Sequence, residues 1–293
     1  METREAGVDR RENQPVPRIR LEFFRHEQKA KTLEGQSDNE VRLTEQGRIN
    51  ATEAGKAKDP HPEVAIAIGS PRDRSTETAM RVMLSKEPGI TQEDTLEDIQ
   101  EFVGDSLKVG RKNMVDHRLD FTFNGEFLEA VQERYGNTKD YLVFAVNESD
   151  ELAKKLKDRK STSYTRQAAG IAEIIRKYVD VLPNFQHAIQ QSPDKYSKYE
   201  NEMQRFLGTH APVSECFLLK IVELTEGKEG LKTFLETGIN KNGFNFSEGF
   251  SVEIQADGIL VRYKGREWNI KPELLDQIIE QRDELDKSID EAA

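Results

Sequence analysis

The stretch Ile19-Arg20-Leu21-Glu22-Phe23-Phe24-Arg25-His26 predicts a buried β-strand that ends at a basic pair. Its first apolar residues alternate with Arg20 and Glu22, which is the period of two expected of a strand. The apolar run stops at Arg25 and His26. A guanidinium and an imidazole would therefore stand together at the end of the strand, where they form a candidate anion site.

Two later segments have the same form, which is an apolar strand, a sharp polar turn with Arg or His, and a helix start. They are Val64–Ala79 and Arg205–Pro212. If all three strands are parallel members of one sheet, their carboxyl ends meet at one edge, where open α/β folds bind ligands. We then expect five side chains to converge there: Arg25, His26, Arg72, Arg74 and His210.

Four motifs in this order resemble the histidine phosphatase superfamily, in the branch that includes the cofactor-dependent phosphoglycerate mutases. They are Arg25-His26, Leu43-Thr44 with Gly47, Ser70-Pro71 with Arg74, and Thr209-His210-Ala211. The resemblance spans residues 19–216. It implies an α/β fold, a three-layer α/β/α sandwich with a mostly parallel central sheet.

The resemblance also implies roles for the motif residues. His26 would be the nucleophile that carries a transient phosphoryl group, and neighbouring arginines would favour its neutral form. Arg25 and Arg74 would clamp phosphate oxygens. His210 would donate a hydrogen bond to the phosphate from the opposite side.

A general acid must protonate the leaving alcohol. Members of the branch carry a carboxylate after a segment of the form Asp-x-Arg-Leu-x-Glu, and Val115–Asp120 is similar to it with an offset of one residue. Asp120 is therefore the first candidate. Three other carboxylates remain open as alternatives: Glu101, Glu126 and Glu148.

Three further residues are candidates for substrate binding. Arg72 would bind a second phosphate or face solvent, and Arg42 closes the Glu27–Arg42 loop, whose basic residues could touch a substrate. Glu27 stands where the family motif has glycine, a residue that permits positive φ and close approach to an anion. Its side chain would point away, act as a displaced acid or weaken the site, and we favour the first.

Composition narrows the class of partner. The chain of 293 residues carries 43 basic and 54 acidic side chains, a net charge of −11, which disfavours nucleic acid and anionic membranes as partners. A small phosphorylated substrate needs only a local basic pocket. The five histidines show no metal-ligand spacing, and no dinucleotide fingerprint or Walker loop appears, so we expect no metal and no cofactor.

The cysteine content and the lack of long apolar segments predict the cellular compartment. A single cysteine, Cys216, excludes an intramolecular disulfide and fits a reducing compartment. No apolar stretch approaches the length of a membrane span, and no apolar segment follows the charged start. We therefore expect a soluble, cytoplasmic protein, whose oligomeric state the sequence does not indicate.

The expected organisation has three parts: a flexible tail over residues 1–17, a histidine phosphatase-like domain over 18–270 with an insertion or cap around 90–165, and a C-terminal helix over 271–293. Apolar runs predict strands at Asp98–Val103 and Tyr141–Val146. Helical periodicity predicts helices at 44–56, 74–84, 126–135 and 166–178, the last bent or ended by Pro183. Asp257-Gly258 predicts the turn of a hairpin over 249–263.

The predicted function is a metal-independent phosphatase that hydrolyses a phosphomonoester through phosphohistidine at His26, with a small phosphorylated metabolite as substrate. One alternative is a phosphomutase that uses the same intermediate. The other is a pseudo-phosphatase that keeps the fold and acts as a binding module, an alternative suggested by Glu27 and by the open identity of the acid.

Overall fold

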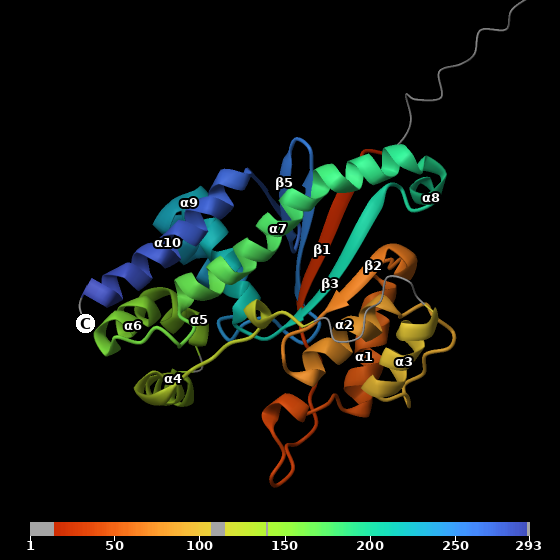
Figure 1. Ribbon diagram of the computed structural model, residues 1–293. Helices are drawn as coiled ribbons and strands as arrows, with labels where there is room; N and C mark the ends of the chain where they lie inside the picture. The colour runs from red at the N-terminus through yellow and green to blue at the C-terminus, as the bar shows by residue number, and fades with distance from the viewer. Residues whose placement is uncertain (1–14, 107–114, 139, 292–293) are drawn as a thin grey trace, which may run out of the picture.

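A six-stranded sheet with the order β2-β3-β1-β4-β5-β6 lies at the centre of the computed structural model, which describes residues 15–106, 115–138 and 140–291 (Figure 1). β1, β2 and β3 are parallel, and β4, β5 and β6 extend the sheet from β1 as antiparallel strands. The strands are β1 (Arg18–Arg25), β2 (Ala65–Ile68), β3 (Glu202–Thr209), β4 (Gly249–Gln255), β5 (Gly258–Tyr263) and β6 (Arg266–Ile270). The predicted α/β sandwich is confirmed, and its sheet is mixed, because the three motif strands are parallel and the three later strands are antiparallel.

The helices fill the connections between these strands. The α-helices are α1 (Glu45–Lys56), α2 (Asp73–Met83), α3 (Leu96–Ser106), α4 (Gly125–Thr138), α5 (Tyr141–Phe144), α6 (Asp150–Leu156), α7 (Tyr164–Gln191), α8 (Pro193–Ser197), α9 (Val213–Thr233) and α10 (Pro272–Glu291). Three short 3₁₀ helices are η1 (Asp38–Glu40), η2 (Pro62–Val64) and η3 (His117–Leu119), and two π-helical turns are η4 (Ala145–Ser149) and η5 (Phe234–Gly238).

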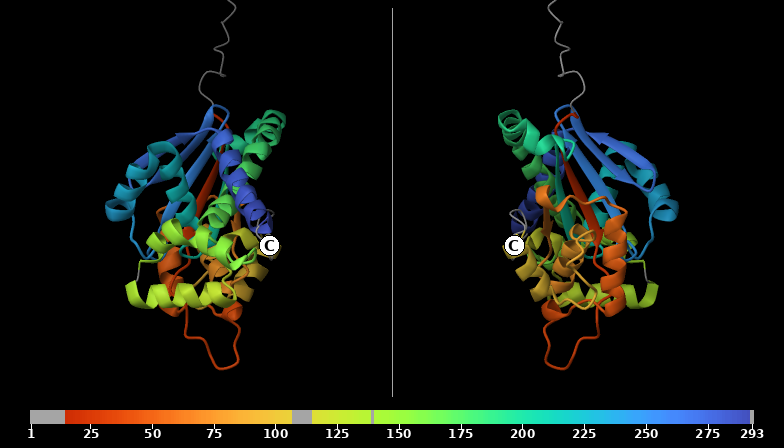
Figure 2. Two further views of the ribbon diagram at one scale, coloured as in Figure 1. Left: turned by 90° about the vertical axis from the view of Figure 1, so that its left-hand side faces the viewer. Right: turned by 90° about the vertical axis from the view of Figure 1, so that its right-hand side faces the viewer.

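β1 sends its side chains alternately to the two faces of the sheet, and each face has its own helices. Ile19, Leu21 and Phe23 belong to a core that includes residues of α7, α9 and α10. Phe24 belongs to a second core with residues of α2 and α3. The result is three layers, with the sheet between two groups of helices, and Figure 2 views the molecule from two opposite sides. The alternation of side chains along β1 therefore places neighbouring residues in two different cores, one on each face of the sheet.

The helices that follow the first two motif strands begin where the sequence predicts. The Thr44 side chain accepts a hydrogen bond from the Gly47 N–H at 3.0 Å and caps α1. α2 lies close to β3 at Gly208, where a Cβ atom would stand 2.2 Å from the Ser75 carbonyl oxygen. The Ser75 hydroxyl also donates to the Gly208 carbonyl at 2.6 Å. Glycine at this position thus allows the start of α2 to pack on the strand.

The predicted strand at Asp98–Val103 is wrong, because this segment is part of α3. Thr95 and Asp98 form a reciprocal cap, in which the Asp98 carboxylate accepts from the Thr95 N–H at 2.8 Å and the Thr95 hydroxyl accepts from the Asp98 N–H at 3.2 Å. Leu96, Ile99 and Val103 are buried on one face at helical spacing. Thr95 and Asp98 are therefore the residues in the sequence that favour a helix over a strand here.

The predicted strand at Tyr141–Val146 is also wrong, since α5 and η4 occupy it. Short apolar runs do not distinguish a strand from a buried helix by periodicity alone. Here Tyr141 and Phe144 pack on aromatic rings of the neighbouring segment, with ring centroids 5.9 Å apart between Phe123 and Tyr141 and 6.5 Å apart between Phe127 and Phe144. This tertiary packing buries the run in helical form.

α7 does not end at Pro183 but continues to Gln191. Leu182, Phe185 and Ile189 stay buried on both sides of the proline, so packing maintains the helix beyond the missing N–H. The hairpin with its turn at Asp257-Gly258 and the C-terminal helix are present as predicted. Residues 1–14 of the predicted tail lie outside the described residues, and the domain boundaries and the cap remain predictions.

Among the described residues, no helix combines the length and the apolar character that crossing a lipid bilayer requires.

Candidate active site

The parallel strands β1 and β3 bring the two predicted histidines together at their carboxyl ends. The His26 N–H donates to the Thr209 carbonyl at 2.9 Å, which fixes the two strand ends side by side. The rings of His26 and His210 meet edge to face, with centroids 4.8 Å apart. Both residues are buried, with exposed fractions of 7% and 2%. The predicted convergence of these two imidazoles is thus present in the structure.

The hydrogen bonds of His26 determine which of its nitrogens is free to react. Nδ1 lies 2.6 Å from the carbonyl oxygen of Glu27, and because a carbonyl only accepts, Nδ1 carries the proton. Nε2 therefore keeps its lone pair and faces Arg74, whose Nε is 3.4 Å away. Burial, together with the charges of Arg74 and Arg25, lowers the pKa of His26 to about 3. The imidazole is neutral at neutral pH, as a nucleophile must be.

Arg74 and Arg25 flank His26 from different elements. Arg74 stands in the first turn of α2 and is buried, so its guanidinium is aimed at the end of β1. Arg25 ends β1, and its Nη1 donates to the Phe244 carbonyl at 2.6 Å. Its guanidinium also lies over the ring of Phe246, 4.8 Å from the centroid. Arg74 thus lies against Nε2 of His26, and Arg25 adds positive charge from the neighbouring residue.

His210 is held on the other side of His26 by Ser70, which directly follows β2 and Gly69. Its Nε2 lies 2.6 Å from the Ser70 hydroxyl and 3.7 Å from Asp120 Oδ1. Burial, followed by the neighbouring charges of the site, lowers the pKa of His210 well below its usual value. Within the described part of the chain, His210 Nδ1 and Arg25 Nε are buried without a hydrogen-bond partner. These two atoms provide unused hydrogen-bonding capacity beside His26.

Asp120 reaches the site through the segment that precedes α4. Its chain is tied to the strand ends by two bonds, from the Asp116 N–H to the Gly69 carbonyl at 2.9 Å and from the Thr209 hydroxyl to the Leu119 carbonyl at 2.8 Å. Asp120 Oδ1 accepts from Arg72 Nε at 2.7 Å. A carboxylate therefore lies next to His210, within the same cluster as Arg72.

Asp38, which was not predicted from the sequence, forms ion pairs with cations of the site. Its Oδ2 accepts from Arg74 Nη2 at 2.9 Å and from Arg72 Nη1, and its Oδ1 accepts from Lys29 Nζ at 2.9 Å. The residue sits on η1 in the Glu27–Arg42 loop, where no regular periodicity points to it. The sequence offered one hint of its position, which is that a loop containing lysines follows the first motif.

The Glu27 side chain points away from the histidine pair, in the direction that the favoured interpretation expects. It is buried, and its Oε2 accepts from the Gln28 N–H at 3.3 Å and from Asn50 Nδ2 of α1 at 3.4 Å. Its φ is not positive, so the backbone at this position does not need glycine. The predicted substrate contact of Glu27 is therefore not seen in this geometry.

Arg42 is likewise not brought to the centre of the site. Its Nη2 pairs with Glu97 of α3 and with Asp73 of α2 at 3.3 Å. Arg72 does join the site, as described, and its guanidinium lies over the ring of Phe121, 4.3 Å from the centroid. Of the predicted substrate-binding residues, Arg72 brings its side chain to the described cluster, whereas Glu27 meets it through its main-chain carbonyl.

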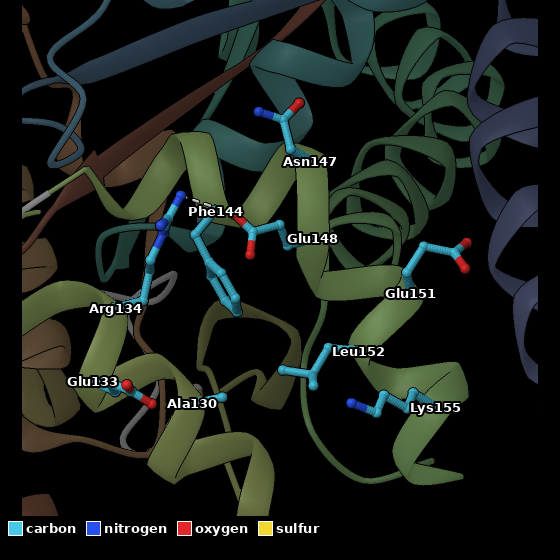
Figure 3. A pocket seen from close by; sticks show the side chains of 9 residues that line it. All are labelled: Ala130, Glu133, Arg134, Phe144, Asn147, Glu148, Glu151, Leu152 and Lys155. Atoms are coloured by element: carbon cyan, nitrogen blue, oxygen red, sulfur yellow. Dashed lines mark hydrogen bonds and ion pairs between the residues drawn. The ribbon is translucent and has the colours of Figure 1, made fainter.

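A separate pocket of about 490 Å³ lies between α4, η4 and α6 (Figure 3). It holds Glu148, an alternative acid, paired with Arg134 at 2.9 Å, and Lys155 and Glu133 line it as well. None of the histidines or arginines of the candidate site lines this pocket. Glu101 and Glu126 are exposed on α3 and α4. Among the predicted carboxylates, Asp120 is therefore the one that lies next to His210.

His61, His117 and His187, which match no motif, lie outside the site. His61 is near Asp59, His187 contacts Gln191, and His117 is exposed on η3. In the ranges that the structure describes, no group of three or more His, Cys, Asp and Glu side chains is arranged to hold a metal ion. Cys216 is buried in the core, as predicted.

Comparison with known proteins finds a family model that matches part of the chain. Residues 21–152 match the model of the histidine phosphatase superfamily (branch 1). The resemblance is thereby confirmed for the three motifs within this stretch, whereas Thr209-His210-Ala211 lies beyond it. Members of that superfamily include phosphatases and mutases.

Solved structures with similar chains are distant in sequence. A mycobacterial glucosyl-3-phosphoglycerate phosphatase is 16% identical, with 80% of this chain and 90% of that chain covered and a TM-score of 0.45. A phosphoglycerate mutase from Bacillus anthracis is also 16% identical, with 90% and 98% covered and a TM-score of 0.43. A protein described as mycobacterial hydrolase 1 is 17% identical, with 87% and 99% covered and a TM-score of 0.47. No curated protein matches the chain.

Proposed function

We propose that this chain is a metal-independent phosphomonoesterase that works through a phosphohistidine at His26. The observation that carries the proposal is the anion already held by the cluster, which is the carboxylate of Asp38 between Arg72, Arg74 and Lys29. A phosphate group presents the same kind of acceptor oxygens to the same guanidinium groups. The site is therefore built to bind an anion within reach of the Nε2 lone pair of His26.

The first chemical step transfers the phosphoryl group to the protein. The Nε2 lone pair attacks phosphorus in line with the ester oxygen, an N–P bond forms, and the O–P bond breaks. Arg25 and Arg74 stabilise the charge on the equatorial oxygens, and His210 faces the same group from the other side. The departing oxygen takes a proton from Asp120, which we assign as the general acid.

The second step returns the protein to its starting state. Water attacks the phosphorus of phosphohistidine, Asp120 takes the proton from that water, and the N–P bond breaks to release inorganic phosphate. A mutase would differ only in the acceptor, which would be a second substrate hydroxyl instead of water. Small phosphorylated metabolites are the proposed substrates, and a cytoplasmic location is proposed with them.

The test is hydrolysis of p-nitrophenyl phosphate by the purified chain, in a buffer that contains EDTA. We expect release of inorganic phosphate with the wild type. His26→Gln should lower kcat/KM by about 10³-fold or more, because the nucleophile is lost. His61→Gln is the matched control, since this histidine lies outside the site, and it should keep wild-type rates.

Two results would contradict the proposal. One is turnover by His26→Gln at the wild-type rate, which would move the chemistry to another residue. The other is the absence of turnover by the wild type across pH 5–9 with several aryl and alkyl phosphates, which would favour a pseudo-phosphatase that only binds its ligand.

A further inference from the structure

Asp38 makes contacts that a bound phosphate would be expected to make. Its two carboxylate oxygens accept from Arg72 Nη1, from Arg74 Nη2 at 2.9 Å and from Lys29 Nζ at 2.9 Å. Its main-chain carbonyl accepts from Arg74 Nη1 at 2.6 Å. Three cations from two segments, the Glu27–Arg42 loop itself and the start of α2, thus converge on one acidic residue of that loop.

These contacts satisfy both arginines in the absence of a ligand. Arg74 directs its Nε to His26 and both of its Nη groups to Asp38. Arg72 directs its Nε to Asp120, its Nη1 to Asp38 and its Nη2 to the Phe121 carbonyl at 3.2 Å. A phosphate that binds these guanidinium groups in the same way has to replace Asp38.

The electrostatic setting keeps Asp38 charged. Burial would raise the pKa of its carboxyl group, but the hydrogen bonds and charges of Lys29 and Arg74 outweigh burial and lower that pKa well below its usual range. The group is therefore an anion at every pH at which the enzyme would be assayed. As an ionised group with a short side chain, it is a poor proton donor but an effective occupant of an anion site.

The loop that carries Asp38 can release it into water. The Asp38 side chain is 40% exposed, and most residues between Lys31 and Glu40 are exposed as well. The base of the loop is fixed by a bridge between Lys29 and Leu43. Figure 2 shows the loop extending beyond the sheet edge, away from the helical layers. A side chain in such a segment exchanges a partner for solvent more easily than a core residue does.

We infer that Asp38 is an internal substitute for the substrate phosphate, which keeps Arg72 and Arg74 in place and competes with phosphorylated ligands for them. This inference rests on the proposed function, because it assumes that phosphate binds at these arginines. It goes beyond that function by assigning a role in substrate affinity to a residue outside the motifs.

Competition of this kind has a defined thermodynamic signature. The apparent dissociation constant equals the intrinsic one divided by the fraction of protein in which Asp38 has left the arginines. Every anion that uses the site is therefore weakened by the same factor. The chemical step itself is unaffected, since Asp38 is already displaced when the ester is bound. Removal of the charge should lower KM and leave kcat unchanged.

The experiment compares the wild type with Asp38→Asn, which keeps the shape of the side chain and removes its charge. Glu34→Gln is the matched control, because it removes one exposed negative charge from the same loop. Calorimetric titration with inorganic phosphate, and separately with sulfate, gives the affinities. We expect Asp38→Asn to bind both anions about tenfold more tightly, because the anion no longer competes with a charge-assisted hydrogen bond. The affinities of Glu34→Gln should equal those of the wild type.

Kinetics with p-nitrophenyl phosphate supply the second readout, which should show a lower KM for Asp38→Asn at the wild-type kcat. Thermal unfolding confirms that all three proteins are folded. Equal or weaker anion binding by Asp38→Asn, beside a wild type that binds phosphate, would overturn the inference and make Asp38 an ordinary structural partner of the arginines. Failure of both proteins to bind phosphate at millimolar concentration would overturn the phosphate site itself.

Discussion

Two neutral imidazoles buried among arginines define this site at the scale of single residues. His26 has its Nδ1 proton bound to a carbonyl and its Nε2 lone pair directed at Arg74, so its orientation and its tautomer are both fixed. Burial and cationic neighbours lower the pKa of His26 and of His210 in the same direction. The arrangement keeps the His26 imidazole unprotonated and places its Nε2 beside positive charge, as the proposed phosphoryl transfer requires.

The lowered pKa of His26 predicts how stability depends on pH. The unfolded chain binds a proton at this residue below about pH 6.5, whereas the folded chain does so only below about pH 3. Stability from the neutral buried ring is therefore fully present above pH 6.5 and is lost as the pH falls toward 3. Between pH 7.5 and pH 5, His26 alone should account for about 2 kcal/mol of the decrease in unfolding free energy.

Urea unfolding at these two pH values measures the effect in the wild type and in His26→Gln. The variant should lose about 2 kcal/mol less than the wild type between pH 7.5 and pH 5. His61 is half-buried and lies outside the site, so His61→Gln is the matched histidine-to-glutamine control. Equal pH dependence in the wild type and His26→Gln would mean that the His26 ring is protonated at pH 5 in the folded chain as readily as in the unfolded chain.

The residues of the site differ in how well the sequence predicts them. Arg25, His26, Arg74 and His210 follow strands or begin a helix, so regular structure determines where they lie. Asp38 could not be predicted, because it sits in a loop whose conformation depends on Lys29, Arg72 and Arg74 in three dimensions. Arg42 was placed near the substrate because of its charge alone, and the acidic residues of α2 and α3 bind it instead.

At the scale of elements, the site depends on how closely α2 approaches the parallel strands. Amphipathic helices and strands near the motifs were predictable because their patterns are long. The two apolar runs at 98–103 and 141–146 were not, since each is short and its helical form is decided by a cap or by aromatic packing. Pro183 inside α7 shows the same competition, in which packing outweighs a local helix breaker.

Gly208→Ala tests the contact between α2 and β3. The added methyl group would meet the Ser75 carbonyl at 2.2 Å, so the first turn of α2, with Arg74, has to shift. We expect a loss of about 1–3 kcal/mol in unfolding free energy and a fall in kcat/KM for p-nitrophenyl phosphate. Gly258→Ala in β5 is the matched control, because its Cβ would have ordinary van der Waals room, 3.6 Å from the nearest atom. Full activity of folded Gly208→Ala would show that the approach of α2 does not position Arg74.

At the scale of the whole molecule, an acidic chain concentrates a few cations at one edge of its sheet. The net charge is −11, yet Arg25, Arg72 and Arg74 gather around the histidine pair. The parallel order β2-β3-β1 achieves this, because each strand ends at the same edge and is followed by part of the site. Positive charge is therefore concentrated at this edge of an otherwise acidic molecule, where it can attract a small anion.

The most direct test of the account is detection of the covalent intermediate. The protein is mixed with a ³²P-labelled aryl phosphate, quenched within milliseconds to seconds and analysed by acid and alkali treatment and by peptide mass spectrometry. The account predicts a label that is labile in acid, stable in alkali and located on His26, and that is absent from His26→Gln. A label on a different residue, or turnover with no phosphorylated protein at any quench time, would contradict it.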